Sequence, residues 1–306
     1  MKFIYTIHRI VILWSALLAL LLPFGVVKAE QLSIGFTEFG RGVHYLNDDS
    51  ALARFVRLAT LGQLVESSQV IGGQPEFLLQ LSDSVRSDMR HGRWSFRLKN
   101  GIQFSSGRTL HLRDALYSLK RCQQQGVLSA NLRFTPRLEP HVMSNGRNIE
   151  RQWLDVSFPV GFVRDDFQAL NQRIGKCPIL EWASSELFGA ELGAGTNLVS
   201  AGPFVLQEFK PGNSITLTRN NYFHGRRAAL DGLRLRAIQS ASQGLSALRL
   251  GTVAALFTND VMLISRAHAD ETLEVDSCLG FTVVYRRSLN LVCRPVAGVV
   301  DLKYLS

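Results

Sequence analysis

Hydrophobic residues recur along this chain at two spacings, which predict both strands and helices. Every second residue between Trp94 and Leu98 is apolar, so this segment is expected to form a strand with one face toward solvent. Apolar residues three or four positions apart between Leu112 and Leu119 predict a helix. The same patterns predict further strands at residues 32–36, 102–104, 153–158 and 233–236, a helix of about 15 residues after Ser50, and helices at residues 162–174 and 245–250.

The best-defined local structure is a β-hairpin at Phe204–Thr218. Two strand-like segments flank the turn Lys210-Pro211-Gly212-Asn213, where Pro211 fixes the first turn dihedral and Gly212 accommodates the positive φ that follows. Residues 123–152, by contrast, are polar and predict no element. Strands and helices in mixed order, without an internal repeat, predict a mixed α/β fold.

The amino-terminal 29 residues have the layout of a secretion signal. Lys2 and Arg9 precede the apolar stretch Ile10–Leu22, and helix breakers then lead to the small residue Ala29. We expect cleavage after Ala29 and a mature protein outside the cytoplasm. An uncleaved membrane anchor stays open as an alternative, because Ile10–Val27 has 18 largely apolar residues, the lower limit for a span.

Composition predicts a folded, globular protein rather than a disordered chain. Of the 306 residues, 46% are hydrophobic and 19% are charged. The formal net charge of +9 is typical of nucleic-acid-binding proteins, but Lys2, Arg9 and Lys28 supply three of these charges and fall within the expected signal. The remaining chain carries +6, and we expect no nucleic-acid partner for an exported protein.

Four cysteines follow the expected signal: Cys122, Cys177, Cys278 and Cys293. An even number in an exported protein favours disulfides, and three pairings are possible. Joining Cys278 to Cys293 would close a loop of about 15 residues and stabilise the fold by about 3 kcal/mol, and Cys122 would then pair with Cys177. Four buried free thiols are the alternative. Position 30 is Glu rather than the Cys of a lipid-anchored protein.

Catalytic and metal-binding motifs are absent from the sequence. The seven His residues have no ligand spacing, so we expect no metal site. No Gly-x-Ser-x-Gly elbow and no assignable nucleophile and base occur, so we expect neither catalysis nor a cofactor. Four arginines offer an anion-binding face, although a solvated strand face is the simpler interpretation: Arg226, Arg227, Arg234 and Arg236.

Two separated blocks of sequence carry a family resemblance. The first comprises Trp94–Phe104, Ser106-Gly107 and Asp114–Arg121. The second comprises Ala201–Leu206, Phe209, Pro211-Gly212, Ile215–Leu217, Arg219-Asn220, Gly225 and Leu230-Asp231. Their order and spacing, over about residues 32–257, resemble the signature of family 5 extracellular solute-binding proteins, the family of the periplasmic dipeptide- and oligopeptide-binding proteins.

Departures from the family pattern fall on polar positions. His111 stands where the family usually has a Thr that caps the helix, although Asp114 still occupies the first helical turn. Residues 221–224 read Asn-Tyr-Phe-His, where family members tend to have Pro, an acidic residue, Tyr and Trp. The glycines and apolar positions that determine the fold match better than the polar ones.

The resemblance implies a fold like that of the type II periplasmic binding proteins, in which the ligand lies between two lobes. By this resemblance, residues 30–48 and 160–257 form the first lobe, and residues 49–159 form an inserted family-specific domain. Residues 258–306 then remain as a remnant of the second lobe or a tail, in which residues 282–285 and 289–292 are expected to pair as strands. We therefore expect the second lobe to be mostly absent.

The resemblance also implies a function: the solute-binding component of a peptide-type ABC uptake system. Such a protein is a periplasmic monomer that docks on an ABC permease in the inner membrane and supplies it with a solute for transmembrane transport. The solute is expected to be a peptide or another small molecule, contacted by the residues after the first strand: Glu38, Phe39 and Gly40. Loss of the second lobe is expected to impair or alter binding. Two alternatives stay open, a one-lobed periplasmic sensor or interaction protein and a truncated inactive paralogue.

Overall fold

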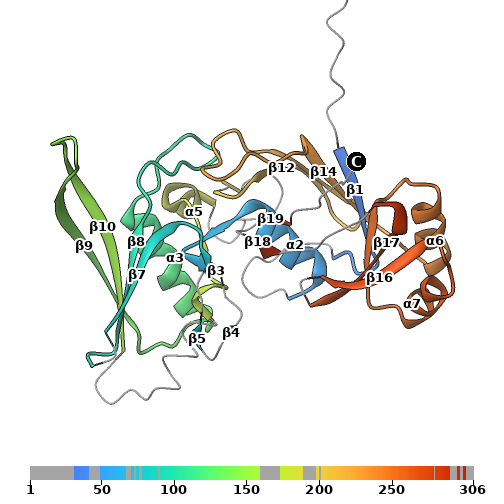
Figure 1. Ribbon diagram of the computed structural model, residues 1–306, viewed down its shortest axis with the longest axis horizontal. Helices are drawn as coiled ribbons and strands as arrows, with labels where there is room; N and C mark the ends of the chain where they lie inside the picture. The colour runs from blue at the N-terminus through green and yellow to red at the C-terminus, as the bar shows by residue number, and fades with distance from the viewer. Residues whose placement is uncertain are drawn as a thin grey trace, which may run out of the picture. The chain divides into compact units, whose positions relative to one another are not determined.

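The computed structural model describes two layered cores, both of which lie after residue 30. The first is built on a sheet of seven strands in the order β12-β13-β14-β1-β15-β17-β16 (Figure 1). The second is built on a sheet of four strands in the order β7-β8-β10-β9. The described residues are 31–40, 49–66, 70–71, 74–75, 78–88, 90–158, 173–188, 198–199, 201–278, 280–289, 295–296 and 299–300.

The seven-stranded sheet has parallel strands at its centre and antiparallel strands at its edges. β1 pairs in parallel with β14 on one side and β15 on the other, whereas the remaining pairs are antiparallel. The strands are β1 (Gln31–Phe36), β12 (Phe204–Lys210), β13 (Ser214–Arg219), β14 (Gly232–Ala237), β15 (Ala255–Thr258), β16 (Leu273–Cys278) and β17 (Phe281–Arg286).

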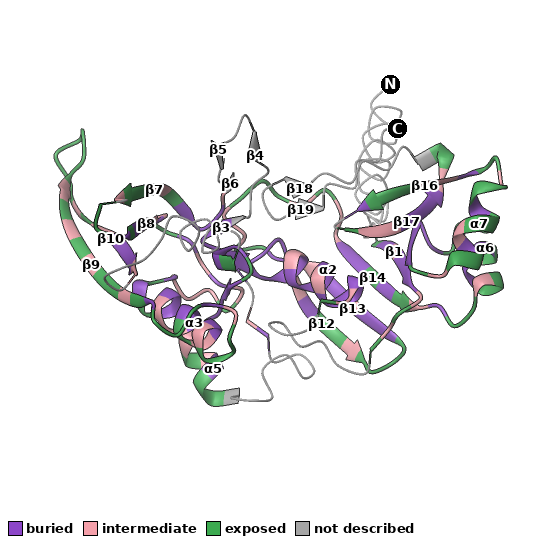
Figure 2. Ribbon diagram, turned by 90° about the horizontal axis from the view of Figure 1, so that it is seen from below, coloured by how far each residue is buried: buried purple, intermediate pink, exposed green. Residues whose placement is uncertain are grey.

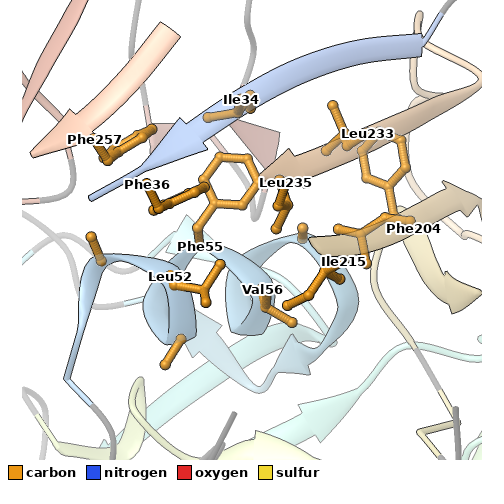
Figure 3. Close-up of a cluster of buried hydrophobic side chains, with 14 of the residues drawn as sticks. Ile34, Phe36, Leu52, Phe55, Val56, Phe204, Ile215, Leu233, Leu235 and Phe257 are labelled. Carbon is orange, nitrogen blue, oxygen red and sulfur yellow. The ribbon is translucent and has the colours of Figure 1, made fainter. Parts of the chain in front are cut away.

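Helix α2 (Ala51–Thr60) covers one face of this sheet (Figure 3). Its buried side chains meet every second residue of β1 and β15, because alternate residues of a strand point to the same face. The rings of Phe36 and Phe257 stack with centroids 5.0 Å apart, and the ring of Phe55 lies 5.8 Å from each. Three aromatic rings therefore hold the helix against the middle of the sheet.

Helices α6 (Ala241–Arg249) and α7 (Val261–His268) cover the opposite face. Leu245 and Leu263 from these helices pack with Leu256, which points to the face opposite that of Phe257. Gly35 also lies on this face, where a Cβ would come within 2.9 Å of the side chains of Ile238 and Leu256. The sheet is thus buried on both sides, as is usual for parallel strands.

The second core packs α3 (Leu112–Gln124) on one face of the four-stranded sheet (Figure 2). Trp94, Phe96 and Leu98 lie on this face together with Leu154, as their alternation predicts. The four strands are β7 (Ser82–Asp88), β8 (Arg93–Leu98), β9 (Arg133–Val142) and β10 (Asn148–Ser157).

Short elements complete the described residues. The paired strands are β2 (Gly62–Gln63) with β11 (Pro178–Ile179), β3 (Val65–Glu66) with β6 (Leu78–Leu79), β4 (Val70–Ile71) with β5 (Gln74–Pro75), and β18 (Pro295–Val296) with β19 (Val299–Val300). The remaining helical elements are α5 (Trp182–Phe188) and the 3₁₀ turn η2 (Arg287–Leu289).

Gly202 sits where the chain approaches the end of α2. Its N–H donates to the carbonyl oxygen of Thr60 at 2.9 Å, and a Cβ on Gly202 would lie 2.6 Å from the Thr60 carbonyl carbon. Asn220 closes the same site, because its side-chain amide donates to the carbonyl oxygen of Gly202 at 2.8 Å. Close backbone approach therefore explains why glycine occupies this position of the second sequence block.

We expect Gly202→Ala to lower the free energy of unfolding by about 2–3 kcal/mol, because the new methyl group would push two hydrogen-bonded backbones apart. Urea unfolding of the variant and the wild type measures this loss. Gly126→Ala is the control: Gly126 has a φ of 75° but no atom within 4 Å of a Cβ, so only the conformational cost of about 1 kcal/mol applies. Equal losses in the two variants would contradict the steric explanation.

The periodic elements of the sequence are confirmed. The mixed α/β fold, the strands at β1, β8 and β14, the helices α3 and α6, and the β12–β13 hairpin all form where they were predicted. Gly212 in the hairpin turn has a φ of 69°, as the turn requires. The predicted helix at residues 162–174 lies outside the described residues except for its last two positions.

Several predictions about extent were wrong. α2 has ten residues rather than about 15, because Leu61 is extended and Gly62–Gln63 pairs with β11. Residues 102–104 form no ladder strand: Gln103 makes a single bridge to Thr109 across a tight turn. The segment 123–152, predicted to be without elements, contains most of the β9–β10 hairpin.

The carboxyl-terminal strand pair was predicted with the wrong partner. β17 forms as expected, but it pairs with β16 across a turn in which Gly280 has a φ of 79°. Leu289 ends η2, and residues 290–292 lie outside the described residues. β15, β16 and β17 belong to the seven-stranded sheet, and α2 packs in its core. The boundaries expected at residues 49 and 258 therefore do not coincide with the two cores.

Candidate functional site

The carboxyl ends of the three parallel strands form one edge of the seven-stranded sheet. β1, β14 and β15 run in the same direction, so the residues that follow them gather at this edge. The chain leads from β14 to α6 and from β15 to α7 on one face, whereas the next described element after β1 is α2 on the other face. Open α/β sheets bind ligands where successive connections diverge in this way, which makes this edge the candidate site.

Hydrogen bonds join the residues that follow β1 to those that follow β15. The backbone N–H of Thr37 donates to the carbonyl oxygen of Phe257 at 3.1 Å, and the Oγ1 atoms of Thr37 and Thr258 are also 3.1 Å apart. The Asn259 amide donates to the Glu38 carboxylate at 3.1 Å. The two strand ends therefore present an ordered carboxylate and amide to solvent.

The sequence placed three residues in this site, and they have different surroundings. The side chain of Glu38 is exposed, whereas Phe39 is partly buried against the core of the sheet. The carbonyl oxygen of Gly40 accepts a hydrogen bond from the N–H of Gly212 in the hairpin turn, at 3.4 Å. Of the three, Glu38 presents a charged side chain to solvent.

Sequence reasoning missed the partners supplied by β15. Asn259 pairs with Glu38, and the Asp260 carboxylate caps α7 by accepting from the N–H groups of Met262 at 2.9 Å and Leu263 at 3.1 Å. Both residues follow an apolar strand, as Glu38 does, and an Asp before a helix is a recognisable N-cap. That signal could have placed them, had the strand at residues 255–258 been predicted.

A buried ion-pair network lies apart from this edge, at the start of α3. The side chain of Asp114 is fully buried and pairs with Arg108, while its carboxylate also accepts from the N–H groups of His111 and Trp182, each at 2.9 Å. The Arg108 guanidinium bridges to the Glu181 carboxylate at 2.8 Å. Asp114, the third residue of α3, thus accepts from the N–H of the N-cap residue His111, as in a capping box.

The Glu181 carboxylate is kept ionised by its neighbours. Burial alone would raise its pKa, but hydrogen bonds from Ser184, Ser106 and Arg108 bring the pKa below its usual value. All the polar groups of this cluster satisfy one another, so we assign it a structural role that ties the turn at Arg108 to α3 and α5.

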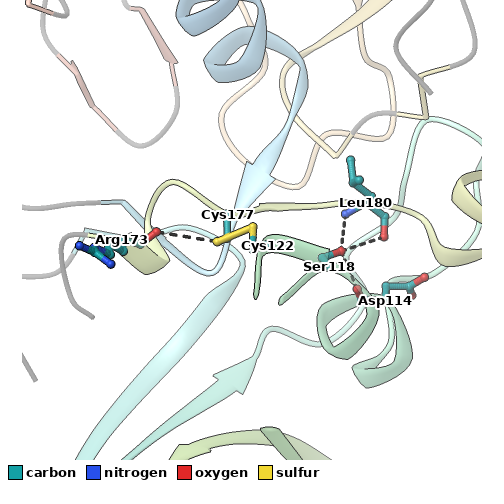
Figure 4. The surroundings of a disulfide bond; sticks show 6 residues. All are labelled: Asp114, Ser118, Cys122, Arg173, Cys177 and Leu180. Carbon is teal, nitrogen blue, oxygen red and sulfur yellow. Dashed lines mark hydrogen bonds between the residues drawn. A yellow bond between two sulfur atoms is a disulfide. The ribbon is translucent and has the colours of Figure 1, made fainter. Parts of the chain in front are cut away.

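A disulfide joins Cys122, near the end of α3, to Cys177, just before β11 (Figure 4). Nearby, the Ser118 hydroxyl donates to the carbonyl oxygen of Asp114 and accepts from the N–H of Leu180. The disulfide and this second hydrogen bond both connect α3 to the segment that contains β11. Cys278 is disulfide-bonded as well, and Cys293, its expected partner, lies outside the described residues.

His224, one of the departures from the family pattern, is half-buried. Burial and the positive charge of Lys99 lower the pKa of His224 to about 4, so the imidazole is neutral at pH 7. Lys99 donates to the carbonyl oxygen of Gln80 at 2.6 Å. His224, in the loop after β13, therefore lies close to Lys99 and Gln80 near the ends of β8 and β7.

Other candidate features of the sequence give no second site. The four arginines considered as an anion-binding face, Arg226, Arg227, Arg234 and Arg236, are all exposed. Within the described residues, no group of His, Cys, Asp and Glu side chains could hold a metal ion. No described helix is long and apolar enough to span a membrane.

A family model described as bacterial extracellular solute-binding proteins, family 5 Middle, matches residues 80–285. The match includes both sequence blocks and about two thirds of the chain. The chain belongs to family 5 of the bacterial extracellular solute-binding proteins. This family is a non-enzymatic class of binding proteins, in agreement with the absence of a catalytic motif. A search of curated protein sequences finds no match.

Solved structures share the fold of this family 5 protein. They include MoaA from A. tumefaciens R10 in complex with mannopinic acid, which is 19% identical with a TM-score of 0.64. DppA from Helicobacter pylori in complex with the peptide STSA is 15% identical with a TM-score of 0.61. NikZ from Campylobacter jejuni in complex with Ni(L-His) is 14% identical with a TM-score of 0.59.

The aligned lengths are unequal in these comparisons. The matches cover 82%, 81% and 82% of this chain but only 49%, 51% and 47% of the MoaA, DppA and NikZ chains. The family 5 protein described by this sequence therefore spans about half the length of the structures it matches.

Proposed function

We propose that this protein is the solute-binding component of a peptide-type ABC uptake system. It acts in the periplasm, is directed there by the signal at residues 1–29, and delivers its solute to an ABC permease in the inner membrane. Family membership supports the class, and one structural observation supports the site: the exposed Glu38–Asn259 pair, 3.1 Å between oxygen and nitrogen, at the carboxyl edge of β1 and β15.

In this proposal the seven-stranded sheet with α2, α6 and α7 is the first lobe, and the four-stranded sheet with α3 is the inserted family-specific domain. The chain then contributes one wall of the solute cleft. A binding protein that closes over its ligand gains affinity by removing water from both sides. With one wall, the charged ends of a peptide stay hydrated, so we expect the 306-residue chain to bind free peptides weakly.

Isothermal titration calorimetry with three solute classes tests both parts of the proposal. The solutes are a tetrapeptide, a nickel–histidine complex and mannopinic acid, the classes bound by the relatives above. We expect binding of one class with a dissociation constant above about 100 μM, corresponding to about −5 kcal/mol. A low-micromolar constant would contradict the one-walled cleft.

Glu38→Ala tests the position of the site. The variant is expected to weaken the detected binding by about tenfold to a hundredfold, since a hydrogen bond to a carboxylate contributes about 1.5–3 kcal/mol. Glu208→Ala is the matched control: this carboxylate is also exposed, pairs with Lys210 at 2.9 Å and lies on the edge strand β12. Unchanged binding by the Glu38 variant, or an equal loss in the control, would place the solute elsewhere.

A second candidate function is a one-lobed interaction protein, and one observation favours it. Val261 and Met262 at the start of α7 are 76% and 62% exposed, directly after Asn259 and Asp260. Two large, exposed apolar side chains beside the candidate site are suited to contact with another protein. Calorimetric titrations that show no heat for any solute class would favour this function over transport.

A further inference from the structure

Positive charge is concentrated in one part of the chain. Residues 78–158, which contain the four-stranded sheet and α3, have thirteen Lys and Arg against six Asp and Glu, a net charge of +7. The whole chain carries +9, of which three charges lie in residues 1–29. The rest of the chain after residue 29 is therefore close to neutral, and the charge belongs to the second core.

The face of the four-stranded sheet opposite α3 carries most of these charges. The register places Arg97 of β8 and Arg137 of β9 on either side of Trp153, on the face away from Leu154 and α3. Alternation along the strands assigns six arginines to this face: Arg86, Arg93, Arg97, Arg133, Arg137 and Arg151. Arg90 and Arg147 lie at the turns that bound it.

Trp153 forms the centre of this arginine face. The Arg86 guanidinium lies 4.2 Å from the centroid of its ring, and those of Arg97 and Arg137 lie 5.5 and 5.4 Å away. The indole is fully buried, and these three guanidinium groups lie over it. Three cations are thus held in fixed positions on a rigid sheet.

Carboxylates neutralise only part of the arginine face. Arg97 pairs with Asp83, Arg137 with Asp155 at 3.5 Å, and Arg93 with Asp88 at 3.2 Å. Counting Glu139 as well, four acidic residues oppose eight arginines. Among the described residues, Arg86 has no carboxylate partner. The face therefore retains a positive charge that another molecule can neutralise.

The shape and chemistry of the arginine face fit an anionic membrane surface. A sheet face with exposed arginines at positions 86, 93 and 133 offers a broad surface, unlike the concave pocket that a small anion needs. Every cation on it is Arg, whose planar group binds phosphate oxygens in pairs. The tip of the β9–β10 hairpin is exposed (Figure 2). Val142 and Met143 are 62% and 41% exposed there, and the Met143 N–H donates to the carbonyl oxygen of Arg147, so apolar side chains lie beside a basic one, which suits the lipid headgroup boundary.

We propose that the arginine face docks the protein on anionic phospholipid. Docking of this kind would bring a solute-binding protein to the membrane that holds its permease, and in this respect the inference extends the proposed function. Docking uses none of the residues at the Glu38–Asn259 edge, so experiments can reject the membrane-docking proposal and the proposed solute site independently.

Vesicle co-sedimentation of the chain from Glu30 onward tests this inference, since all the described structure follows that residue. The probes are vesicles of phosphatidylglycerol mixed with phosphatidylcholine, and vesicles of phosphatidylcholine alone. We expect binding only to the anionic vesicles, weakening steeply with added salt. The variant Arg90→Glu, Arg133→Glu, Arg147→Glu changes three exposed arginines outside the Trp153 cluster and should lower the partition coefficient by at least about tenfold.

A charge-matched control separates this face from net charge. The variant Arg226→Glu, Arg227→Glu, Arg234→Glu changes the same number of exposed arginines outside the second core, and its binding should stay within about twofold of the wild type. Equal losses in the two variants, or no binding of the wild type at low salt, would overturn the proposal. So would release of the protein from vesicles by an equal charge of DNA or polyglutamate, which would identify another acidic macromolecule as the better partner.

A neutral variant keeps the test valid if charge reversal disturbs folding. Arg90→Gln, Arg133→Gln, Arg147→Gln removes the charges without adding repulsion, and circular dichroism verifies its fold. It should lose about half as much binding free energy as the reversed variant. Wild-type binding by this variant would also overturn the proposal.

Discussion

Replacing Cys122 and Cys177 together by alanine is expected to lower the free energy of unfolding by about 4 kcal/mol. The disulfide joins residues 55 positions apart, so it removes a large loop-closure entropy from the unfolded chain. The loop it closes contains the whole β9–β10 hairpin. Denaturant unfolding followed by tryptophan fluorescence measures the loss, and Trp153 within this loop reports on it directly.

The second disulfide requires a control of its own. In a Cys278→Ala, Cys293→Ala background, Cys122 and Cys177 are the cysteines that remain. Adding a reductant to this background opens one bond and should cause the same loss as the double alanine variant. An unfolding midpoint that does not change with reductant would contradict the stabilising role of the Cys122–Cys177 bond.

Asp114→Ala is expected to cost about 3–5 kcal/mol, the range for removing one partner of a buried ion pair. The variant leaves the N–H groups of His111 and Trp182 without their acceptor and leaves Arg108 with one carboxylate instead of two. Because Asp114 lies in the first turn of α3, we expect the four-stranded core to loosen as well. The free energy of unfolding from urea titrations is the measurement.

Asp83→Ala is the matched control for the Asp114 variant. Asp83 also pairs with an arginine, Arg97, but its side chain is 38% exposed and the pair lies at the surface. Surface pairs contribute about 0–1 kcal/mol, so this variant should stay close to the wild type. Asp114→Asn, which keeps one acceptor oxygen, should lose less than the alanine variant. A loss below about 1 kcal/mol for Asp114→Ala would contradict the structural role of the network.

Elements with strong local signals could be predicted from the sequence. The β12–β13 hairpin is specified by Pro211 and Gly212, and α3 by apolar residues on one face. β9 was missed because its segment is polar. β9 contains Pro136 and Pro140, and it is an edge strand, where the missing N–H of proline is tolerated. Local pattern alone cannot show whether a strand will lie at an edge.

Contacts between distant segments could not be predicted. Arg108 and Glu181 are 73 residues apart, and no periodicity links them. Glu38 was predicted as a site residue because it follows an obvious strand and resembles a family position. Its hydrogen-bond partner Asn259 is 221 residues away and follows a short strand. The partner of β17 was predicted wrongly because a segment close in sequence was preferred. The apolar residues 289–292 follow β17 directly, but β17 pairs with β16.

The position of β1 has a consequence for how this protein is made. β1 is the first described strand, yet Leu32 pairs with Leu233 and Ile34 with Ala255, both about 200 residues later. During synthesis the central strand has no neighbours until β14 and β15 have left the ribosome, so the seven-stranded sheet cannot assemble cotranslationally from its amino-terminal end. Such high contact order predicts slow folding. If the chain is exported as proposed, that delay is an advantage, because a chain that stays unfolded can be threaded through a secretion channel.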